Sequence, residues 1–185
     1  MTHARFSPDG RLLGTVTDDH TARIWDASTG RPRTRELRHR LNCQSIAFSP
    51  GSRFIVVTGL SSFRLPGGKA QGEVVIWDVQ TGRGVPHPNK AIVRDAEFSP
   101  DGRKIVVATS SLQAEIRDAK TLLALTPPLA HQSSVRKARF SPDGRRVVTA
   151  SFDGTARVWD AATGKAIRRP LGHPGPVRHA RFSRD

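Results

Sequence analysis

The sequence predicts an all-β protein built from repeated units, and two observations carry this prediction. A cassette related to Phe-Ser-Pro-Asp-Gly recurs along the whole chain, with its phenylalanine at Phe6, Phe48, Phe98, Phe140 and Phe182. The steps between these residues are 42, 50, 42 and 42 residues, so one unit of about 42 residues is repeated. Short β-branched runs separate the cassettes, and no stretch keeps a helical periodicity.

A Trp-Asp pair follows the phenylalanine at a fixed distance. The pairs begin at Trp25, Trp77 and Trp159, and the third copy has Arg117-Asp118 instead. The distance is 19 residues in all copies except the second, where it is 29. The second copy therefore has a ten-residue insertion near residues 59–70. The expected units are approximately 1–38, 39–88, 89–130, 131–172 and a partial unit 173–185.

Two turn signals divide each unit into strands. Ser-Pro-Asp-Gly occurs at 7–10, 99–102 and 141–144, where proline fixes φ and glycine supplies a left-handed position. A Thr-Gly turn follows the Trp-Asp pairs. Between the turns, runs such as 146–150 and 155–159 have the length and the β-branched residues of strands.

At its Phe-Ser-Pro-Asp-Gly and Trp-Asp residues the chain resembles the WD-repeat family. A period of 40–45 residues with Trp-Asp dipeptides is typical of propeller blades with four strands each. The resemblance covers nearly all of the chain. It implies a partial β-propeller of about four four-stranded antiparallel blades plus the first strand of a fifth.

Histidines mark the boundaries of the units. His39, His131 and His173 each stand nine residues before the phenylalanine of their copy, whereas the first copy would need its histidine before Met1. Phe182 begins a further copy. Because blades bury their faces against neighbours, an open sector needs a cover. Three arrangements are open: a piece of a longer propeller, self-association with a second copy to close the ring, or a small ring that closes alone.

The fourth copy contains a hydroxyl, an imidazole and a carboxylate, a set that also occurs in Ser-His-Asp catalysis. The family resemblance instead implies a structural hydrogen-bond network, formed by His131, Thr149, Asp153 and Trp159. The matching residues in the other copies are Thr15, Asp19, Trp25, His39, Trp77 and His173. The second copy has Val57 and Gln71 at the other two positions, and the third copy has none of the four residue types. We expect the third unit to be the least rigid.

No other motif predicts catalysis, a cofactor or a metal. The seven histidines do not form a ligand spacing with Cys43 or with carboxylates. Gly67-Gly68-Lys69 lacks the earlier glycine and the Ser or Thr of a phosphate-binding loop. We therefore expect a non-enzymatic protein without a cofactor or a metal site.

Composition bears on partners and location. Thirty Lys and Arg against sixteen Asp and Glu give a net charge of +14, which favours acidic partners. The densest basic run is Arg31, Arg33, Arg35, Arg38 and Arg40. Without interleaved aromatic residues or a groove-binding helix, nucleic acid is the weaker alternative. One cysteine, no signal peptide and no membrane-spanning stretch predict a cytoplasmic protein that is not inserted in a membrane.

The resemblance also implies where a protein partner binds, namely the rim formed by the histidine-containing loops and the tight turns. The candidate residues are Phe152, Asp18, Ser134 and Pro176, together with Phe63 and Arg64 in the insertion. Phe152 is the strongest candidate because exposed aromatic residues dominate many interfaces. The predicted function is a scaffold for protein interactions. The alternatives are a regulatory array in a larger signalling protein, and an Arg-rich surface that binds acidic protein or nucleic acid.

Overall fold

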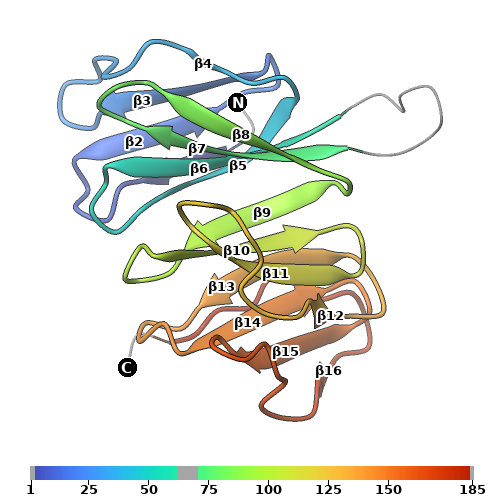
Figure 1. The fold of residues 1–185 in the computed structure, drawn as a ribbon. Helices are drawn as coiled ribbons and strands as arrows, with labels where there is room; N and C mark the ends of the chain where they lie inside the picture. Colours follow the sequence, from blue (N-terminus) through green and yellow to red (C-terminus); the bar gives the residue numbers. More distant parts are fainter. Residues whose placement is uncertain (1–2, 62–70, 184–185) are drawn as a thin grey trace. The chain divides into compact units, whose positions relative to one another are not determined.

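The computed structural model describes residues 3–61 and 71–183, which form strands and turns without a helix. The chain divides into two compact units, an N-terminal unit of Met1–Ala96 and a C-terminal unit of Glu97–Asp185. The described residues contain four antiparallel sheets of four strands each (Figure 1). The boundary between the units falls within one strand, β9 (Val93–Phe98).

Sheets 1 and 2 belong to the N-terminal unit, and neighbouring strands in each are consecutive in the sequence. Sheet 1 consists of β1 (His3–Phe6), β2 (Leu12–Val16), β3 (Thr21–Asp26) and β4 (Leu37–Arg38). Sheet 2 consists of β5 (Asn42–Phe48), β6 (Phe54–Leu60), β7 (Gly72–Asp78) and β8 (Gly84–Asn89).

Sheets 3 and 4 repeat this order. Sheet 3 consists of β9 (Val93–Phe98), β10 (Lys104–Thr109), β11 (Gln113–Asp118) and β12 (Leu129–Ala130). Sheet 4 consists of β13 (Val135–Phe140), β14 (Arg146–Ser151), β15 (Thr155–Asp160) and β16 (Leu171–Gly172). The predicted fold class, an all-β partial propeller with four-stranded blades, is confirmed.

The turns between strands have the geometry that their sequences predict. In the turn between β13 and β14, Gly144 has a φ of 70° and its N–H donates to the carbonyl of Ser141. The Ser141 hydroxyl donates to Asp143, and the Arg146 N–H donates back to that hydroxyl at 3.0 Å. These side-chain bonds hold the turn in one conformation.

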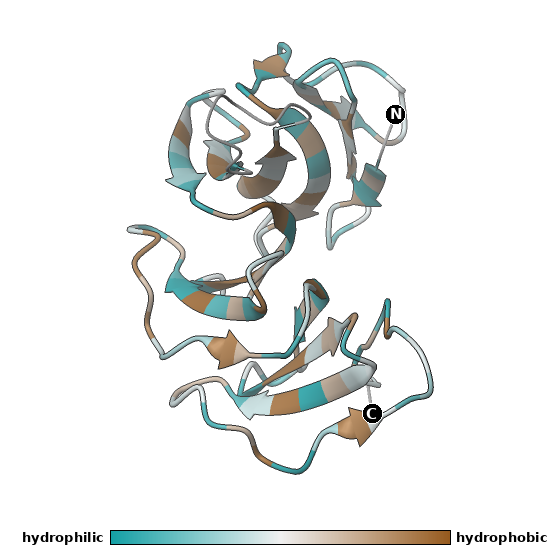
Figure 2. Ribbon diagram, turned by 90° about the vertical axis from the view of Figure 1, so that its right-hand side faces the viewer, coloured by the Kyte–Doolittle hydropathy of each residue, from teal (hydrophilic) through white to brown (hydrophobic). Residues whose placement is uncertain are grey.

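Within each unit, one sheet covers the face of the next. β5 packs against β1, β2 and β3 in the N-terminal unit, and β13 packs against β10 and β11 in the C-terminal unit. Alternating hydropathy along the strands provides these apolar faces (Figure 2). Ile24, Ile46 and Ile55 are fully buried in the first core, and Ile116 and Leu129 are fully buried in the second.

Two details differ from the sequence prediction. Gly59 and Leu60 belong to β6, so the extra segment starts later than predicted, and residues 62–70 lie outside the described residues. Residues 173–183 contain no strand, although the sequence predicts the first strand of a fifth blade there. A strand needs a hydrogen-bonded neighbour, and in the described part of the chain no strand pairs with this segment.

Candidate functional site: histidine networks and the exposed rim

Sheet 4 brings together the four side chains of the predicted network. His131 lies just before β13, Thr149 on β14, Asp153 in the turn after β14 and Trp159 on β15. His131 Nδ1 is 2.8 Å from Asp153 Oδ2, and His131 Nε2 is 2.7 Å from the Thr149 hydroxyl. Trp159 Nε1 donates to the same hydroxyl at 2.8 Å. One continuous chain of bonds therefore joins a loop, two strands and a turn.

The polar atoms of this network leave no group free for chemistry. The Asp153 carboxylate requires a donor, so His131 Nδ1 carries the proton and Nε2 accepts from the Thr149 hydroxyl. Burial lowers the pKa of His131 below its ordinary value, although the hydrogen bond to Asp153 opposes this. Burial also raises the pKa of Asp153, but bonds from Thr155, Gln132 and His131 outweigh it and hold that pKa well below its usual range. The resting state is a neutral imidazole beside a carboxylate.

Sheet 2 buries a histidine with different partners. Trp77 Nε1 donates directly to His39 Nε2 at 3.1 Å, since Val57 offers no hydroxyl. His39 Nδ1 lies 3.5 Å from Glu73 Oε1, and both side chains are almost fully buried. Burial raises the pKa of Glu73, but His39 and backbone N–H groups lower it below its usual value overall.

Sequence reasoning missed Glu73. In the first and fourth copies the aspartate stands six residues before the tryptophan, and Gln71 occupies that position before Trp77. Glu73 stands only four residues before Trp77. Glu73 lies on β7, opposite Gly59 of β6. Its side chain is one methylene longer than that of aspartate and reaches the imidazole from a strand position. A carboxylate of either length within the first residues of the third strand is the signal that could have found it.

Sheet 1 contains the hydroxyl, the carboxylate and the indole of the network, but its histidine, His3, lies on β1 and not at the position that His131 has in sheet 4. Trp25 Nε1 donates to the Thr15 hydroxyl at 2.8 Å, as in sheet 4. Asp19 accepts from the Thr21 hydroxyl at 2.7 Å and from the Thr17 hydroxyl. A pocket of about 190 Å³ lies between these side chains.

Sheet 3 has an unrelated polar cluster. Glu115 accepts from Gln113 Nε2 at 2.7 Å and from two Arg117 nitrogens at 2.9 and 2.6 Å. All three residues lie on β11. Arg117 stands at the sequence position of the missing tryptophan, and the bonds of this cluster stay within β11.

The predicted rim residues fall into both units. In the C-terminal unit, Phe152 is 38% exposed and its N–H donates to the Ser134 carbonyl at 3.0 Å. Pro176 is exposed, and the next residue, Val177, donates its N–H to the carbonyl of Ser151. These residues therefore lie around one turn. Asp18 is exposed in the N-terminal unit, and Phe63 and Arg64 lie outside the described residues.

His173 does not enter a network within the described residues. Its N–H donates to the Gly154 carbonyl at 2.8 Å, and the residue is exposed. The same backbone bond anchors His131 to Leu112 and His39 to His20. The backbone of His173 is thus bonded like that of the other two histidines. Within the described residues, however, its imidazole makes no side-chain hydrogen bond.

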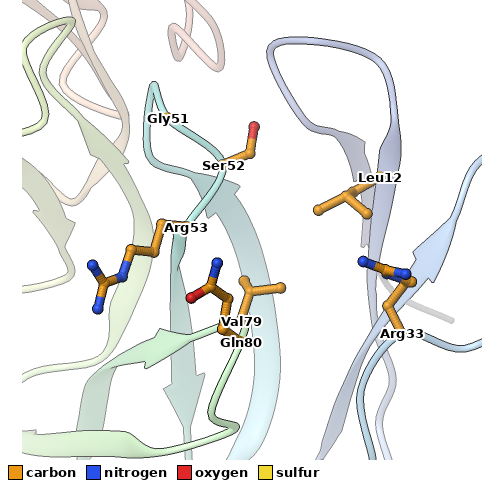
Figure 3. A pocket seen from close by; sticks show the side chains of 7 residues that line it. All are labelled: Leu12, Arg33, Gly51, Ser52, Arg53, Val79 and Gln80. Atoms are coloured by element: carbon orange, nitrogen blue, oxygen red, sulfur yellow. The ribbon is translucent and has the colours of Figure 1, made fainter.

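A pocket of about 370 Å³ in the N-terminal unit was not predicted from the sequence. Leu12 and Val79 contribute apolar atoms, and Arg33, Ser52 and Gln80 contribute polar ones (Figure 3). Arg53 points away from Leu12, and its Nε binds Asp78 Oδ2 at 3.1 Å. The lining comes from β2 and from the segments after β3, β5 and β7, so no local motif could have revealed it.

The remaining groups are ordinary surface or core. Burial and nearby carboxylates raise the pKa of the Cys43 thiol to about 12, so this cysteine is a buried, unreactive residue. Across residues 3–61 and 71–183, no three His, Cys, Asp or Glu side chains gather where they could bind a metal ion. In the same residues no helix could cross a membrane. The five arginines of residues 31–40 are all exposed around β4, the outermost strand of sheet 1.

Comparisons with known proteins agree with the repeats and the sheets. The family model described as "WD domain, G-beta repeat" matches residues 1–26 and 123–160. The chain belongs to the WD-repeat family. A second model, "Eukaryotic translation initiation factor eIF2A", matches residues 19–136 of these WD repeats.

Three curated relatives are also similar to this WD-repeat chain. Pre-mRNA-processing factor 19 homolog 2 of Arabidopsis thaliana is 26% identical over 70% of this chain and 23% of its own length. Eukaryotic translation initiation factor 3 subunit I of Pyricularia oryzae is 26% identical over 59% of this chain and 29% of its own length. WD repeat-containing protein 26 homolog of Drosophila melanogaster is 30% identical over 55% of this chain and 16% of its own length. The WD-repeat chain thus spans less than a third of each relative.

A solved structure shows the same fold. The crystal structure of the computationally designed Ika8 protein matches with a TM-score of 0.81 and 22% identity. The match covers 97% of this WD-repeat chain and 52% of the designed one. It supports the arrangement of strands within the blades and carries no information on function.

Proposed function

We propose that the chain is a non-enzymatic platform for protein partners. The observation that carries the proposal is Phe152, an aromatic side chain 38% exposed on a turn that is held rigidly. Its own N–H is bonded to Ser134, and the hydroxyl of Ser151 donates to the carbonyls of Ser133 and Ser134 at 3.2 Å. A preordered aromatic side chain loses little entropy on binding, which is why such residues dominate interfaces.

The histidine networks support the non-enzymatic part of the proposal. In sheet 4 every polar atom of His131 and Thr149 already has a partner, and the cluster is buried. A nucleophile needs access to a substrate and a base with a free valence. WD-repeat proteins are generally non-catalytic scaffolds, and one of the relatives is named as a subunit of a larger factor.

The experiment compares proteins retained by immobilised full-length chain and by two variants. Phe152→Ala removes the proposed contact, and Phe54→Ala is the matched control because Phe54 is 36% exposed in the other unit. We expect quantitative mass spectrometry to find a protein set kept by the wild type and by Phe54→Ala but depleted at least about tenfold by Phe152→Ala. Equal retention by all three, with unchanged circular dichroism, would refute the role of Phe152. A variant lacking residues 62–70 tests Phe63 and Arg64 in the same way.

Two further proposals rest on separate observations. Because the chain spans at most 29% of the curated relatives, it fits a regulatory array within a larger, cytoplasmic signalling protein. The five exposed arginines of residues 31–40 fit an acidic protein segment or nucleic acid. Salt titration separates nucleic-acid binding by the arginines from capture of a protein through Phe152. Nucleic-acid binding weakens steeply with salt, whereas apolar capture through Phe152 does not.

A further inference from the structure

Sheet 1 has an empty place for an imidazole. Thr15 and Trp25 are bonded like Thr149 and Trp159, with the same 2.8 Å distance from the indole nitrogen to the hydroxyl. In sheet 4 the imidazole of His131 fills the space between hydroxyl and carboxylate, whereas in sheet 1 that space is a pocket of about 190 Å³. A water takes up about 30 Å³, so the pocket has room for a five-membered ring.

The polar atoms around this pocket match those of a neutral imidazole. Asp153 accepts a hydrogen bond from the Thr155 hydroxyl at Oδ1 and one from His131 at Oδ2. Asp19 likewise uses Oδ1 for Thr21, and within the described residues no hydrogen bond reaches its Oδ2. The Thr15 hydroxyl accepts from Trp25 and has only a long contact, 3.4 Å, to the carbonyl of Arg23. One acceptor and one donor thus remain for Nδ1–H and Nε2 of an incoming ring.

The C-terminal segment, residues 173–183, carries both a histidine and a copy of β1. His-Ala-Arg-Phe-Ser occurs at residues 3–7, which include β1, and again at residues 179–183. His173 precedes Phe182 by the nine residues that separate His131 from Phe140. The segment is anchored on sheet 4 by the N–H groups of His173 and Val177, but it pairs with no strand in the described chain.

The resident strand β1 is the weakest first strand among the four sheets. It has four residues, whereas β5, β9 and β13 have six or seven. Phe6 is 62% exposed, whereas Phe48, Phe98 and Phe140 are 6–8% exposed. Phe182, in the segment that is bonded to sheet 4, is only partly exposed. A strand that brings its own covering sheet would therefore place a buried phenylalanine at the position where β1 has the exposed Phe6.

We propose that residues 173–183 of a second copy of this chain replace β1 in sheet 1 and insert His173 between Thr15 and Asp19. The register is that of β1, so Ala180 takes the place of Ala4 opposite Thr15, and Phe182 takes the place of Phe6 opposite Leu13. Sheet 4 of the donor then covers sheet 1 of the acceptor. The contact is head to tail and joins different surfaces of the two copies. It does not involve Phe152, although the exchanged segment includes Pro176 of the rim, so the Phe152→Ala retention experiment tests the platform function separately.

The test measures the mass of the full chain by light scattering over a range of concentrations. The variants are His173→Ala in the donor segment, Thr15→Val in the acceptor pocket and His87→Ala as the control, since His87 lies on β8, outside both the donor segment and sheet 1. We expect wild type and control to associate with increasing concentration, and each of the two site variants to associate about tenfold more weakly. A mixture of the two site variants should regain association, because one intact donor meets one intact acceptor.

Two results would overturn the proposal. The first is a wild-type chain that stays monomeric at every concentration. If the Trp25 indole signal in nuclear magnetic resonance still responds to His173→Ala in such a monomer, the imidazole comes from the same chain, and the exchange between copies is refuted. The second is association that neither variant weakens. If Thr15→Val proves unfolded by circular dichroism, a disulfide between Leu13→Cys on one tagged copy and Phe182→Cys on another provides the second measurement. That bond should form between copies, and its absence under oxidation would count against the exchange.

Discussion

Sheets 3 and 4 are neighbours in sequence and have the same strand order, yet they are held together by different polar groups. In sheet 4 the network of His131, Thr149, Asp153 and Trp159 joins segments up to 28 residues apart. In sheet 3 the cluster of Gln113, Glu115 and Arg117 stays within β11. The apolar interiors are equally complete, since Val106 and Ile116 are as fully buried as Val147.

This difference separates two tasks that one blade normally combines. The apolar face supplies most of the favourable free energy, and sheet 3 retains it. The long-range network fixes the loop before the first strand against the turn before the third, and sheet 3 lacks this connection. The same turn has a left-handed residue in both sheets, but sheet 4 has Gly154 there with a φ of 79° and sheet 3 has Leu112 with a φ of 65°.

The largest expected effect comes from breaking the sheet 4 network at its carboxylate. Asp153→Ala leaves the N–H groups of Gln132 and Thr155 and Nδ1 of His131 without their acceptor. We expect a loss of about 3 kcal/mol in the free energy of unfolding, measured in urea. Glu115→Ala in sheet 3 should cost less, about 2 kcal/mol, because it leaves only the side chains of Gln113 and Arg117, both on the same strand, without their acceptor. Equal losses would show that the range of the network does not matter.

The pH dependence of stability should belong to sheet 4. Burial lowers the pKa of His131 in the folded chain below the ordinary histidine pKa of 6.5. As the pH falls below 6.5, His131 therefore takes up a proton in the unfolded chain but not yet in the folded chain. Stability therefore falls as the pH drops from about 6.5 toward the folded pKa. Urea unfolding between pH 5 and 8 should show this decline in the wild type and in His179→Ala, and a flatter profile in His131→Gln. A decline that persists unchanged in His131→Gln would assign it to other groups.

The repeats, the four-stranded blades and the members of the sheet 4 network could all be predicted from the sequence. The repeats and blades follow from the spacing of the motifs, whereas the network of His131, Thr149, Asp153 and Trp159 follows from the resemblance to the WD-repeat family. Glu73 and the Glu115 cluster could not be found in this way. Glu73 reaches the imidazole of His39 from a different residue position, and the Glu115 cluster bonds within one strand, so spacing fails where packing in three dimensions allows other polar groups.

The absence of a strand after residue 172 has a similar cause. The segment has the sequence of a first strand, but whether such residues form a strand depends on a partner strand rather than on propensity. Phe6 shows the same dependence, because its cassette matches those of Phe48 and Phe140 while its ring is 62% exposed. Burial at the ends of a repeat array is set by neighbours, which one unit does not encode.

A smaller effect should come from exchanging residues at the tight turn. Leu112 is 50% exposed at a positive φ, so Leu112→Gly relieves backbone strain and loses little apolar burial. We expect a gain of about 0.5–1 kcal/mol in stability. The reciprocal Gly154→Ala is the control, and it should destabilise because a Cβ there would lie 3.0 Å from the carbonyl oxygen of His173. Destabilisation by both changes would mean that the Leu112 side chain makes a contact worth more than the strain.

The smallest effect concerns local opening rather than global stability. Without a connection from the loop before β9 to the turn after β10, sheet 3 should open more often than sheet 4, since local unfolding depends on interactions that cross segments. Amide hydrogen exchange followed by mass spectrometry should show faster exchange in β10 and β11 than in β14 and β15. Asp153→Ala should bring β14 and β15 to the rate of sheet 3, because it removes the same connection. Uniform protection across both sheets in the wild type would mean that the apolar face alone sets their rigidity, and that the network specifies the loop conformation without holding the blade together.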